Sequence, residues 1–360
     1  MLFRSGANQV GIGVKQAGVA QQFSQGNITA TDNPMDLAIN GSGFFQVTDP
    51  STKDTYYTRN GQFKINSSGY IVNAGLQQLM DKSGSPIQLL TTQMPAQATS
   101  KASMQFNLNA QDAITGTAST FSPTDTTTYN RSTQVTAYDA KGSPYSLTYY
   151  FQKTNPTGGS TNDTWNVFVA TNGQLLPSAT TQLTFDNKGL LSNTPAMTIS
   201  ASDLQAAGVG NPNAGGVAVD LTKATEFGTD FSINNVTQDG YSPGQRTGVA
   251  IDAYGNVTVN YSNGQSKLQT QIGLWNFNND QGLKPVGNND WKATTASGDP
   301  IPGTPGAGGL GAIQSGALEE SNVDLTAELV NMITAQREYQ ANAQTIKTLD
   351  QVMQTLVSLR

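Results

Sequence analysis

The last forty residues differ from the rest of the chain in a way that predicts a long helix. Residues 321–360 contain no glycine and no proline, whereas residues 1–320 hold all 37 glycines and all 15 prolines. Glycine and proline are the residues least compatible with a helix interior. The change therefore predicts one uninterrupted helix of about 37 residues, roughly 55 Å long. Ser321 and Asp324 occupy capping-box positions at its expected start.

Apolar and small residues recur along this segment with the alternating four and three spacing of helices that pack lengthwise on other helices. The predicted seam, interrupted at Gln336 and Asp350, consists of Leu325, Leu329, Met332, Tyr339, Ala343, Ile346, Met353 and Val357. We interpret it as a subunit interface. The alternative is an amphipathic helix folded back on the rest of the chain. The length of the helix and the proline- and glycine-rich segment 299–311 before it favour a partner helix.

The composition argues against a nucleic-acid partner and against insertion into a membrane. Charged residues make up 12% of the chain, about half the usual share, and the net charge is −6 without a cluster of lysines and arginines. Because binding to phosphates needs such clusters, we expect no nucleic-acid partner. No run of 18 apolar residues is present, so we expect no membrane insertion. The first ten residues lack the apolar core of a cleaved signal peptide.

The sequence also predicts no catalytic, cofactor-binding or metal-binding residues. Cysteine and histidine are both absent, which removes disulfides, thiolate chemistry, histidine bases and most zinc sites. Gly306, Gly308 and Gly311 have the spacing of a nucleotide loop, but no strand is expected before them and no helix directly after them. Asn276 and Asp280 resemble the start of a calcium loop that lacks its closing glutamate. A linker and a solvated turn are the better interpretations.

The rest of the chain is predicted to be β-rich. Apolar residues alternate in 145–151 and in 165–169, as expected for strands with one buried face. A recurrent turn places Asp or Asn three residues before a glycine, which suits a type I turn followed by a residue with positive φ. It occurs at Asn66–Gly69, Asp81–Gly84, Asp139–Gly142, Asp186–Gly189 and Asp252–Gly255.

Two segments far apart in the sequence resemble the signatures of the flagellar rod and hook family of axial proteins. The motif residues are Asn33, Pro34, Asp36, Gly41, Gly43, Phe44 and Phe45 in the first segment and Ser321, Asn322, Val323, Asp324 and Leu325 in the second. Segments 57–63 and 336–342 resemble the same family. Segments 261–265 and 287–291 are more similar to hook proteins in particular.

This resemblance implies a mainly β protein with two β-rich domains and a long C-terminal helix. We expect a discontinuous core domain in 1–96 and 235–300, and an inserted outer β domain in 97–234. A proline- and glycine-rich linker and return segment would occupy 301–317, and the axial helix 318–360. In the family, this helix pairs with an N-terminal helix. Here the usual N-terminal helical segment is lacking, and residues 8–14 correspond to the entry into the core domain.

The resemblance further implies that the chain is a structural subunit of the bacterial flagellar hook, a curved flexible tube that transmits torque from the rod to the filament as a universal joint. Such a subunit acts in motility and self-assembles into a helical homopolymer. Its other expected partners are the hook cap, distal rod and hook–filament junction proteins and the flagellar export apparatus. The expected location is extracellular, with export that requires no cleaved signal peptide.

Two other classes of function remain possible from the sequence. One is a distal rod protein with an unusually large insert. The other is a secreted β-rich adhesin or phage tail component with a coiled-coil tail, although that class should carry a signal peptide or a longer heptad run. A carboxylate glycosidase would need a pair of acids in a cleft, and no pair stands out in the sequence.

Overall fold

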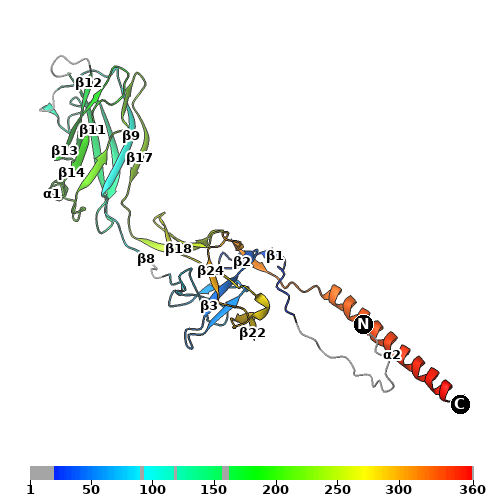
Figure 1. Cartoon of the computed structure of the whole chain (residues 1–360). Helices are drawn as coiled ribbons and strands as arrows, with labels where there is room; N and C mark the ends of the chain where they lie inside the picture. Colours follow the sequence, from blue (N-terminus) through cyan, green and yellow to red (C-terminus); the bar gives the residue numbers. More distant parts are fainter. Residues whose placement is uncertain (1–19, 90–92, 117–119, 156–161, 359–360) are drawn as a thin grey trace. The chain divides into compact units, whose positions relative to one another are not determined.

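The computed structural model describes residues 20–89, 93–116, 120–155 and 162–358 (Figure 1). The expected domain entry at residues 8–14 lies outside these residues. The described chain divides into two compact units. The first unit contains residues 20–89, 249–258 and 268–358, and the second contains the described residues of 93–248 together with 259–267. Both units are β-rich, and one long helix follows at the C-terminal end, so the predicted fold class is confirmed.

The first unit is built on a nine-stranded sheet. Its main order is β22-β23-β4-β3-β7-β6-β5, and β21 pairs with both β3 and β24. Two short antiparallel pairs, β1 with β26 and β2 with β25, join residues 28–40 to residues 312–319. The strands are β1 (Ile28–Ala30), β2 (Leu37–Asn40), β3 (Phe44–Thr48), β4 (Thr55–Thr58), β5 (Lys64–Ile65), β6 (Ile71–Val72), β7 (Gln78–Leu79), β21 (Leu274–Asn276), β22 (Lys284–Gly287), β23 (Asp290–Lys292), β24 (Ile301–Gly303), β25 (Ala312–Ser315) and β26 (Ala317–Glu319). A short 3-10 helix, η2, covers Asp280–Gly282.

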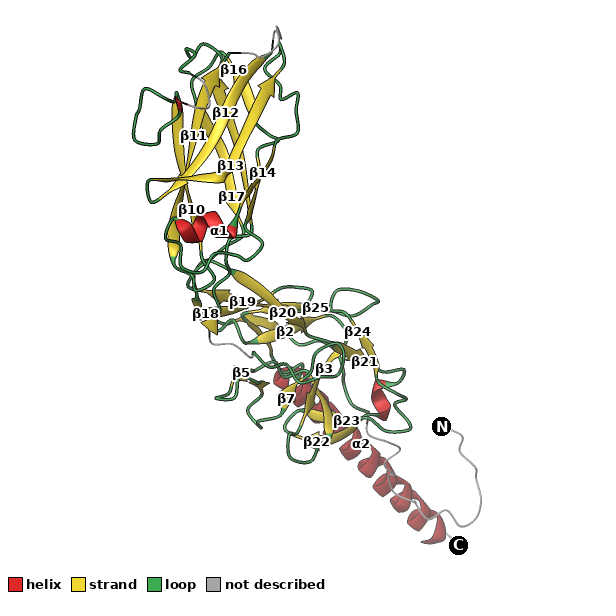
Figure 2. Cartoon of the chain, turned by 90° about the vertical axis from the view of Figure 1, so that its left-hand side faces the viewer, coloured by secondary structure: helices red, strands yellow, loops and turns green. Residues whose placement is uncertain are grey.

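The second unit is a sandwich of two sheets. One sheet has the antiparallel order β10-β11-β12-β13, and the other has the order β14-β15-β9-β16 with β17 on the free side of β9. The elements are β9 (Lys101–Asn109), β10 (Arg131–Tyr138), β11 (Pro144–Thr154), β12 (Asp163–Thr171), β13 (Gln174–Phe185), β14 (Ala196–Ile199), α1 (Ala201–Ala206), β15 (Val217–Asp220), β16 (Thr225–Phe227) and β17 (Ser232–Gln238). Figure 2 shows the long strands lying lengthwise beside one another, with α1 at one end of the sandwich.

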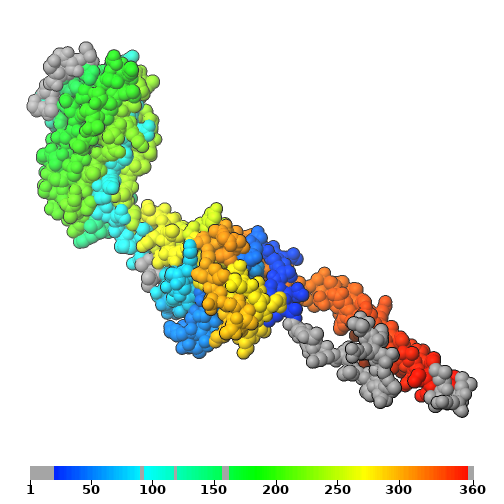
Figure 3. All heavy atoms as spheres, in the orientation of Figure 1, coloured from blue at the N-terminus to red at the C-terminus, as the bar shows by residue number. Residues whose placement is uncertain are grey.

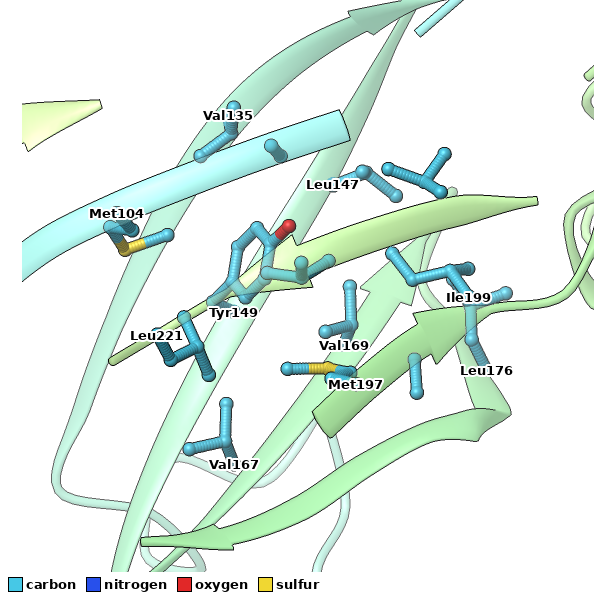
Figure 4. Close-up of a cluster of buried hydrophobic side chains, with 14 of the residues drawn as sticks. Met104, Val135, Leu147, Tyr149, Val167, Val169, Leu176, Met197, Ile199 and Leu221 are labelled. Carbon is cyan, nitrogen blue, oxygen red and sulfur yellow. The ribbon is translucent and has the colours of Figure 1, made fainter. Parts of the chain in front are cut away.

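Alternation along the strands builds the core of the sandwich. Tyr149 on β11 and Val167 and Val169 on β12 point to the interior together with Met104 on β9 (Figure 4). Each of these side chains is at most 2% exposed. A further four-stranded sheet has the order β20-β19-β18-β8 and consists of β8 (Gln93–Met94), β18 (Gly244–Ile251), β19 (Asn256–Tyr261) and β20 (Ser266–Gln271).

All five predicted turns form, and they share one hydrogen-bond pattern. At Asp252, for example, the backbone oxygen accepts from Gly255 N at 2.9 Å, and the side-chain Oδ1 accepts from Tyr254 N and Asn256 N at 2.9 Å each. The fourth residue of every turn is a glycine with φ between 77° and 82°. The side chain of the first residue therefore fixes the turn, and glycine relieves the strain of the left-handed position.

The structure corrects the boundaries expected near the C-terminal end. Residues 301–317 are not a linker, because β24 and β25 lie in them and pair with β21 and β2. Pro302 is tolerated because β24 is the outermost strand of its branch of the sheet and pairs with β21 alone. The helix α2 (Leu325–Ser358) begins later than expected, since β26 occupies part of its predicted first turn. In the part of the chain that the structure describes, no helix is long and apolar enough to cross a membrane.

Candidate assembly site

Two segments lie side by side at the edge of the first unit: the one that enters it, at residues 21–30, and the one that leaves it, at residues 317–322. We call this antiparallel arrangement the crossing. Strand β1 pairs antiparallel with β26, with Ile28 opposite Glu319. Beyond this pair, the Asn322 side-chain amide donates to Gln22 O at 3.0 Å and to Ser24 O at 2.9 Å. The chain that enters the unit and the chain that leaves it toward α2 therefore run side by side in opposite directions.

Arg59 is the centre of this crossing. Its Nε donates to Glu319 Oε2 at 2.8 Å, and its two terminal nitrogens donate to Gly41 O at 2.9 Å and Gly43 O at 3.2 Å. The Arg59 and Glu319 side chains are only 17% and 8% exposed. The other Glu319 oxygen accepts from Gly26 N at 2.9 Å. A buried guanidinium that satisfies its donors with a carboxylate and several carbonyls holds the segments around it in one geometry.

The first family motif supplies the walls of this site. Gly41 and Gly43 have φ of 122° and 120°, which favours glycine and turns their carbonyls toward Arg59. A Cβ at Gly41 would lie 2.8 Å from the Cα of Gly311. Asn33 accepts from Met35 N at 3.1 Å and donates to Asp36 Oδ1 at 3.0 Å. These two hydrogen bonds of the Asn33 side chain close a turn at residues 33–36.

This turn also holds the C-terminal part of the chain. Pro34 O accepts from Ser315 Oγ at 2.7 Å, and Asp36 O accepts from Gly316 N at 2.8 Å. The first family motif is therefore joined by hydrogen bonds to the residues just before β26.

Aromatic packing anchors the entering segment to the large sheet. The rings of Phe44 and Phe23 lie 5.9 Å apart edge to face, and Phe44 is 5.9 Å from the ring of Trp291. The Trp291 indole donates to Gln21 Oε1 at 2.9 Å. The ring of Phe45 packs edge to face against the ring of Phe63, with 5.4 Å between the ring centroids. The two aromatic residues of the motif therefore serve packing on the two sides of β3.

The second family motif leads into the helix. Asp324 is the N-cap, because its Oδ1 accepts from Thr326 N at 2.9 Å and Ala327 N at 3.2 Å. Ser321 Oγ accepts from Val323 N at 3.3 Å and so lies in the turn before the cap. Leu325 is the first residue of α2. The predicted capping box is thus only half correct, and Asp324 alone makes the cap.

The predicted seam of α2 is exposed in this chain. Six of its members, Leu325, Leu329, Met332, Tyr339, Ile346 and Met353, are between 50% and 74% exposed, and Ala343 is partly buried. The Val357 side chain lies outside the described residues. Figure 3 shows the side chains of the orange part of α2 uncovered on the visible face. Four further apolar residues, Val330, Ile333, Leu349 and Val352, are 47% to 60% exposed and were missed by the seam pattern.

The Arg59–Glu319 pair was also missed as a pair. In the sequence Arg59 stands out only as part of segment 57–63, and nothing links it to a residue 260 positions away. Within the described residues, no three His, Cys, Asp or Glu side chains gather in a way that could hold a metal ion. Asn276 and Asp280 belong instead to β21 and η2.

We expect Asn322→Ala to loosen the crossing without unfolding the unit. The change removes the amide that bridges Gln22 and Ser24, and an exposed hydrogen bond contributes about 1 kcal/mol. Amide exchange in residues 22–24 should therefore accelerate about fivefold. Ser321→Ala is the control, since the Ser321 hydroxyl accepts from Val323 N and, among the described residues, does not bridge to Gln22 or Ser24, and it should leave this exchange unchanged. Equal exchange rates in both variants would contradict the bridging role.

These features define a structural class: a β-rich subunit that fixes the exit of a 34-residue exposed helix, in which the two family motifs form that junction. Comparisons with known proteins agree. Models of three families match: the flagellar hook protein FlgE/F/G D1 domain over residues 38–109, the flagellar basal body protein FlaE D2 domain over 107–241, and the flagellar basal body rod FlgEFG protein C-terminal region over 314–359.

Curated relatives match over nearly the whole chain. The flagellar hook proteins FlgE of Salmonella typhimurium and Escherichia coli K12 are each 38% identical to it, over 98% of this chain and 89% of theirs. That of Borreliella burgdorferi is 30% identical over 99% of this chain and 87% of its own. The crystal structure of Helicobacter pylori hook protein FlgE2 shares the fold, with a TM-score of 0.61 and 16% identity over 81% of this chain and all of that one.

The chain belongs to the flagellar hook protein family FlgE. It is a structural protein of the bacterial flagellum and not an enzyme.

Proposed function

We propose that this chain polymerises into the hook tube through α2, with the seam residues buried between helices. The observation that carries the proposal is the set of large apolar side chains that the described chain leaves exposed along the helix. Only five of the 34 helix residues carry a charge, which is few for a helix that would stay in water. Burial of these side chains against other helices would supply the free energy of assembly.

The polar residues of α2 support burial too. Four threonines, Thr334, Thr345, Thr348 and Thr355, donate their hydroxyls to the carbonyl four residues earlier at 2.8 to 3.1 Å. A hydroxyl satisfied inside its own helix can enter an interface without a further partner, and its methyl group then adds apolar surface. The helix is thus suited to packing against other helices over more than the seam.

The apolar surface is wide enough for more than one neighbouring helix. Val330 directly follows the seam residue Leu329, which places it about 100° to one side. Val352 directly precedes Met353 and lies about 100° to the other side. Both added residues are exposed. Each α2 would therefore contact at least two partners, as a wall of packed helices requires.

The crossing next to Arg59 supports, as one of these partners, an N-terminal helix of the kind that the family resemblance implies. The segment that ends at Gln22 runs antiparallel to the segment that leads to α2. A helix of that kind, leading toward Gln22, would therefore end beside the start of α2. This agrees with the helix pairing expected from the family resemblance.

The two units would form two shells around the helices. We assign the first unit to the core domain and the second, which contains most of residues 97–234, to the outer domain. In the assembled hook the subunits would act as a universal joint between rod and filament. Their further partners would be the hook cap, distal rod and hook–filament junction proteins. Delivery would use the flagellar export apparatus, without a cleaved signal peptide, to the extracellular face of the cell.

Immuno-electron microscopy tests this function directly. Antibody raised against residues 130–230 should label only the short curved segment between the cell surface and the filament. Such labelling supports both the hook assignment and the outward position of the second unit. Label restricted to the straight rod, or label on other surface fibres, would contradict the proposal.

A further inference from the structure

Three hydroxyl groups inside the sandwich of the second unit have no hydrogen-bond partner among the described residues. They are Tyr145 OH and Tyr149 OH on β11 and Thr171 Oγ1 on β12. The side chains of Tyr149 and Thr171 are 0% and 1% exposed. Buried polar atoms in folded proteins nearly always hydrogen-bond to the protein or to ordered water. Three exceptions in one core therefore call for an explanation.

The strand register brings these hydroxyls to the same part of the core. Tyr145 and Tyr149 lie on the core face of β11, because side chains alternate along a strand. The register between β11 and β12 ends with Thr148 opposite Ala170. The next residue of β12, Thr171, therefore faces the core between the two tyrosines. Opposite and diagonal side chains on a sheet are about 5 to 8 Å apart, a distance that a tyrosine ring spans.

A pocket of about 290 Å³ opens beside Tyr145. Asp139 also lines this pocket, although its side chain is only 4% exposed. Burial and the charge of Asp139 raise the pKa of Tyr145 to about 12, and burial together with Tyr145 raises the pKa of Tyr149. Effects of one group on the pKa of another act over short distances. The carboxylate and the two phenol groups therefore form one cluster.

Hydrogen bonds within the second unit fix the walls of the pocket. Ala140 N donates to Asn211 O at 2.8 Å, and Asn172 Nδ2 donates to Ala207 O at 2.9 Å. These bonds join the turn between β10 and β11 and the turn between β12 and β13 to the segment after α1. The folded second unit thus builds the pocket from its own residues.

We propose that this pocket binds a chain of ordered water molecules that connects the hydroxyls of Tyr145, Tyr149 and Thr171. Each hydroxyl donates a hydrogen bond to a water, and the water donates onward to Asp139 or to the next water. At about 30 Å³ for each water, the pocket has room for several. An apolar ligand would leave the hydroxyls unpaired, and Asp139 would repel an anion. The proposal does not depend on polymerisation.

Tyr149→Phe tests the proposal by the sign of its effect on stability, because the change keeps the ring and removes only the hydroxyl. If water satisfies that hydroxyl, its loss should lower the melting temperature of the second unit by about 2 to 5 °C in the full chain. A hydroxyl buried without any partner is itself destabilising. An unchanged or higher melting temperature of Tyr149→Phe would therefore overturn the proposal.

Tyr150→Phe is the matched control for this variant. Tyr150 is the next residue of β11, and its ring lies on the opposite face of the sheet, 4.8 Å from the ring of Tyr129. Loss of its hydroxyl should leave the melting temperature unchanged. A loss of stability equal to that of Tyr149→Phe would show that the effect does not come from the pocket, which would refute the proposal.

A crystal structure of the full chain that resolves ordered water tests the site directly. Water peaks should lie within hydrogen-bond distance of the Tyr145, Tyr149 and Thr171 hydroxyls, and the peak at residue 149 should disappear or move in Tyr149→Phe. A pocket without ordered water would contradict the proposal. Exchange of sodium chloride for choline chloride at equal ionic strength should not change the melting temperature. A lower value in choline chloride would show that a cation, and not water, occupies the pocket.

Discussion

Replacing Ile346 by aspartate is expected to abolish polymerisation while both β-rich units stay folded. Ile346 is 67% exposed in the isolated chain, so a carboxylate there meets water and costs the monomer little. In the tube, the same position would be buried between helices, where an unpaired charge costs several kcal/mol. Each 1.4 kcal/mol changes an equilibrium tenfold. The critical concentration should therefore rise by more than about 100-fold.

Gln344→Asp is the matched control for this change. It introduces the same charge two residues earlier, about 200° around the helix from Ile346 and on the side that carries Val330, so it compares the seam with the second apolar side of α2. Sedimentation of purified protein across a concentration series would measure assembly, and calorimetry would show whether the units remain folded. Assembly of Ile346→Asp at the wild-type concentration would refute the seam. Equal loss in both variants would mean that the side of Val330 is buried in the tube as fully as the seam.

Local signals in the sequence predicted the elements that depend only on neighbouring residues. The helix was predicted from the absence of glycine and proline, and its cap from Asp324. The turns at Asn66, Asp81 and their equivalents were predicted because one side chain and one glycine determine each of them. In these cases, the hydrogen bonds that fix the structure join residues at most four positions apart.

Contacts between distant segments were not predictable in the same way. The register of β1 against β26 and the Arg59–Glu319 pair depend on residues about 260 to 290 positions apart. Segment 301–317 was misjudged because its prolines and glycines suggest a linker, although edge strands tolerate them. The apolar residues beside the seam were missed because a heptad pattern selects one stripe of a helix, and α2 is apolar over a wider arc.

The second unit contains a buried ion pair whose removal should be costly. Lys153 Nζ lies 3.0 Å from Glu226 Oε1 and donates to Ala110 O at 2.6 Å. The same Glu226 oxygen accepts from the Trp165 indole at 3.0 Å. The Lys153 and Glu226 side chains are 7% and 2% exposed. Asp163 Oδ2, 3.4 Å from Nζ, is nearer the surface. The carboxylate of Glu226 therefore depends on Lys153 for its only buried countercharge among the described residues.

Lys153→Met should destabilise the second unit by about 3 to 5 kcal/mol at neutral pH, because it leaves Glu226 buried without a partner charge. The double variant Lys153→Met, Glu226→Gln is the control. It removes both charges and keeps an oxygen for the Trp165 indole, so it should recover most of the loss. Denaturant unfolding of the full chain, followed through the transition of the second unit, measures both. A double variant as unstable as the single one would show that packing of the lysine stem, and not charge, sets the stability.

The pH dependence of the stability lost in Lys153→Met is a second test of whether charge or packing causes the loss. Burial raises the pKa of Glu226, and hydrogen bonds from Trp165 and Lys153 oppose the rise. Without Lys153 the pKa should rise further. A carboxyl with a higher pKa in the folded state binds more protons there, so stability falls as pH increases through the folded value. The loss of unfolding free energy in Lys153→Met, relative to the wild type, should accordingly be small near pH 4 and complete at neutral pH. A deficit that is constant across this range would exclude the unpaired carboxylate as its cause.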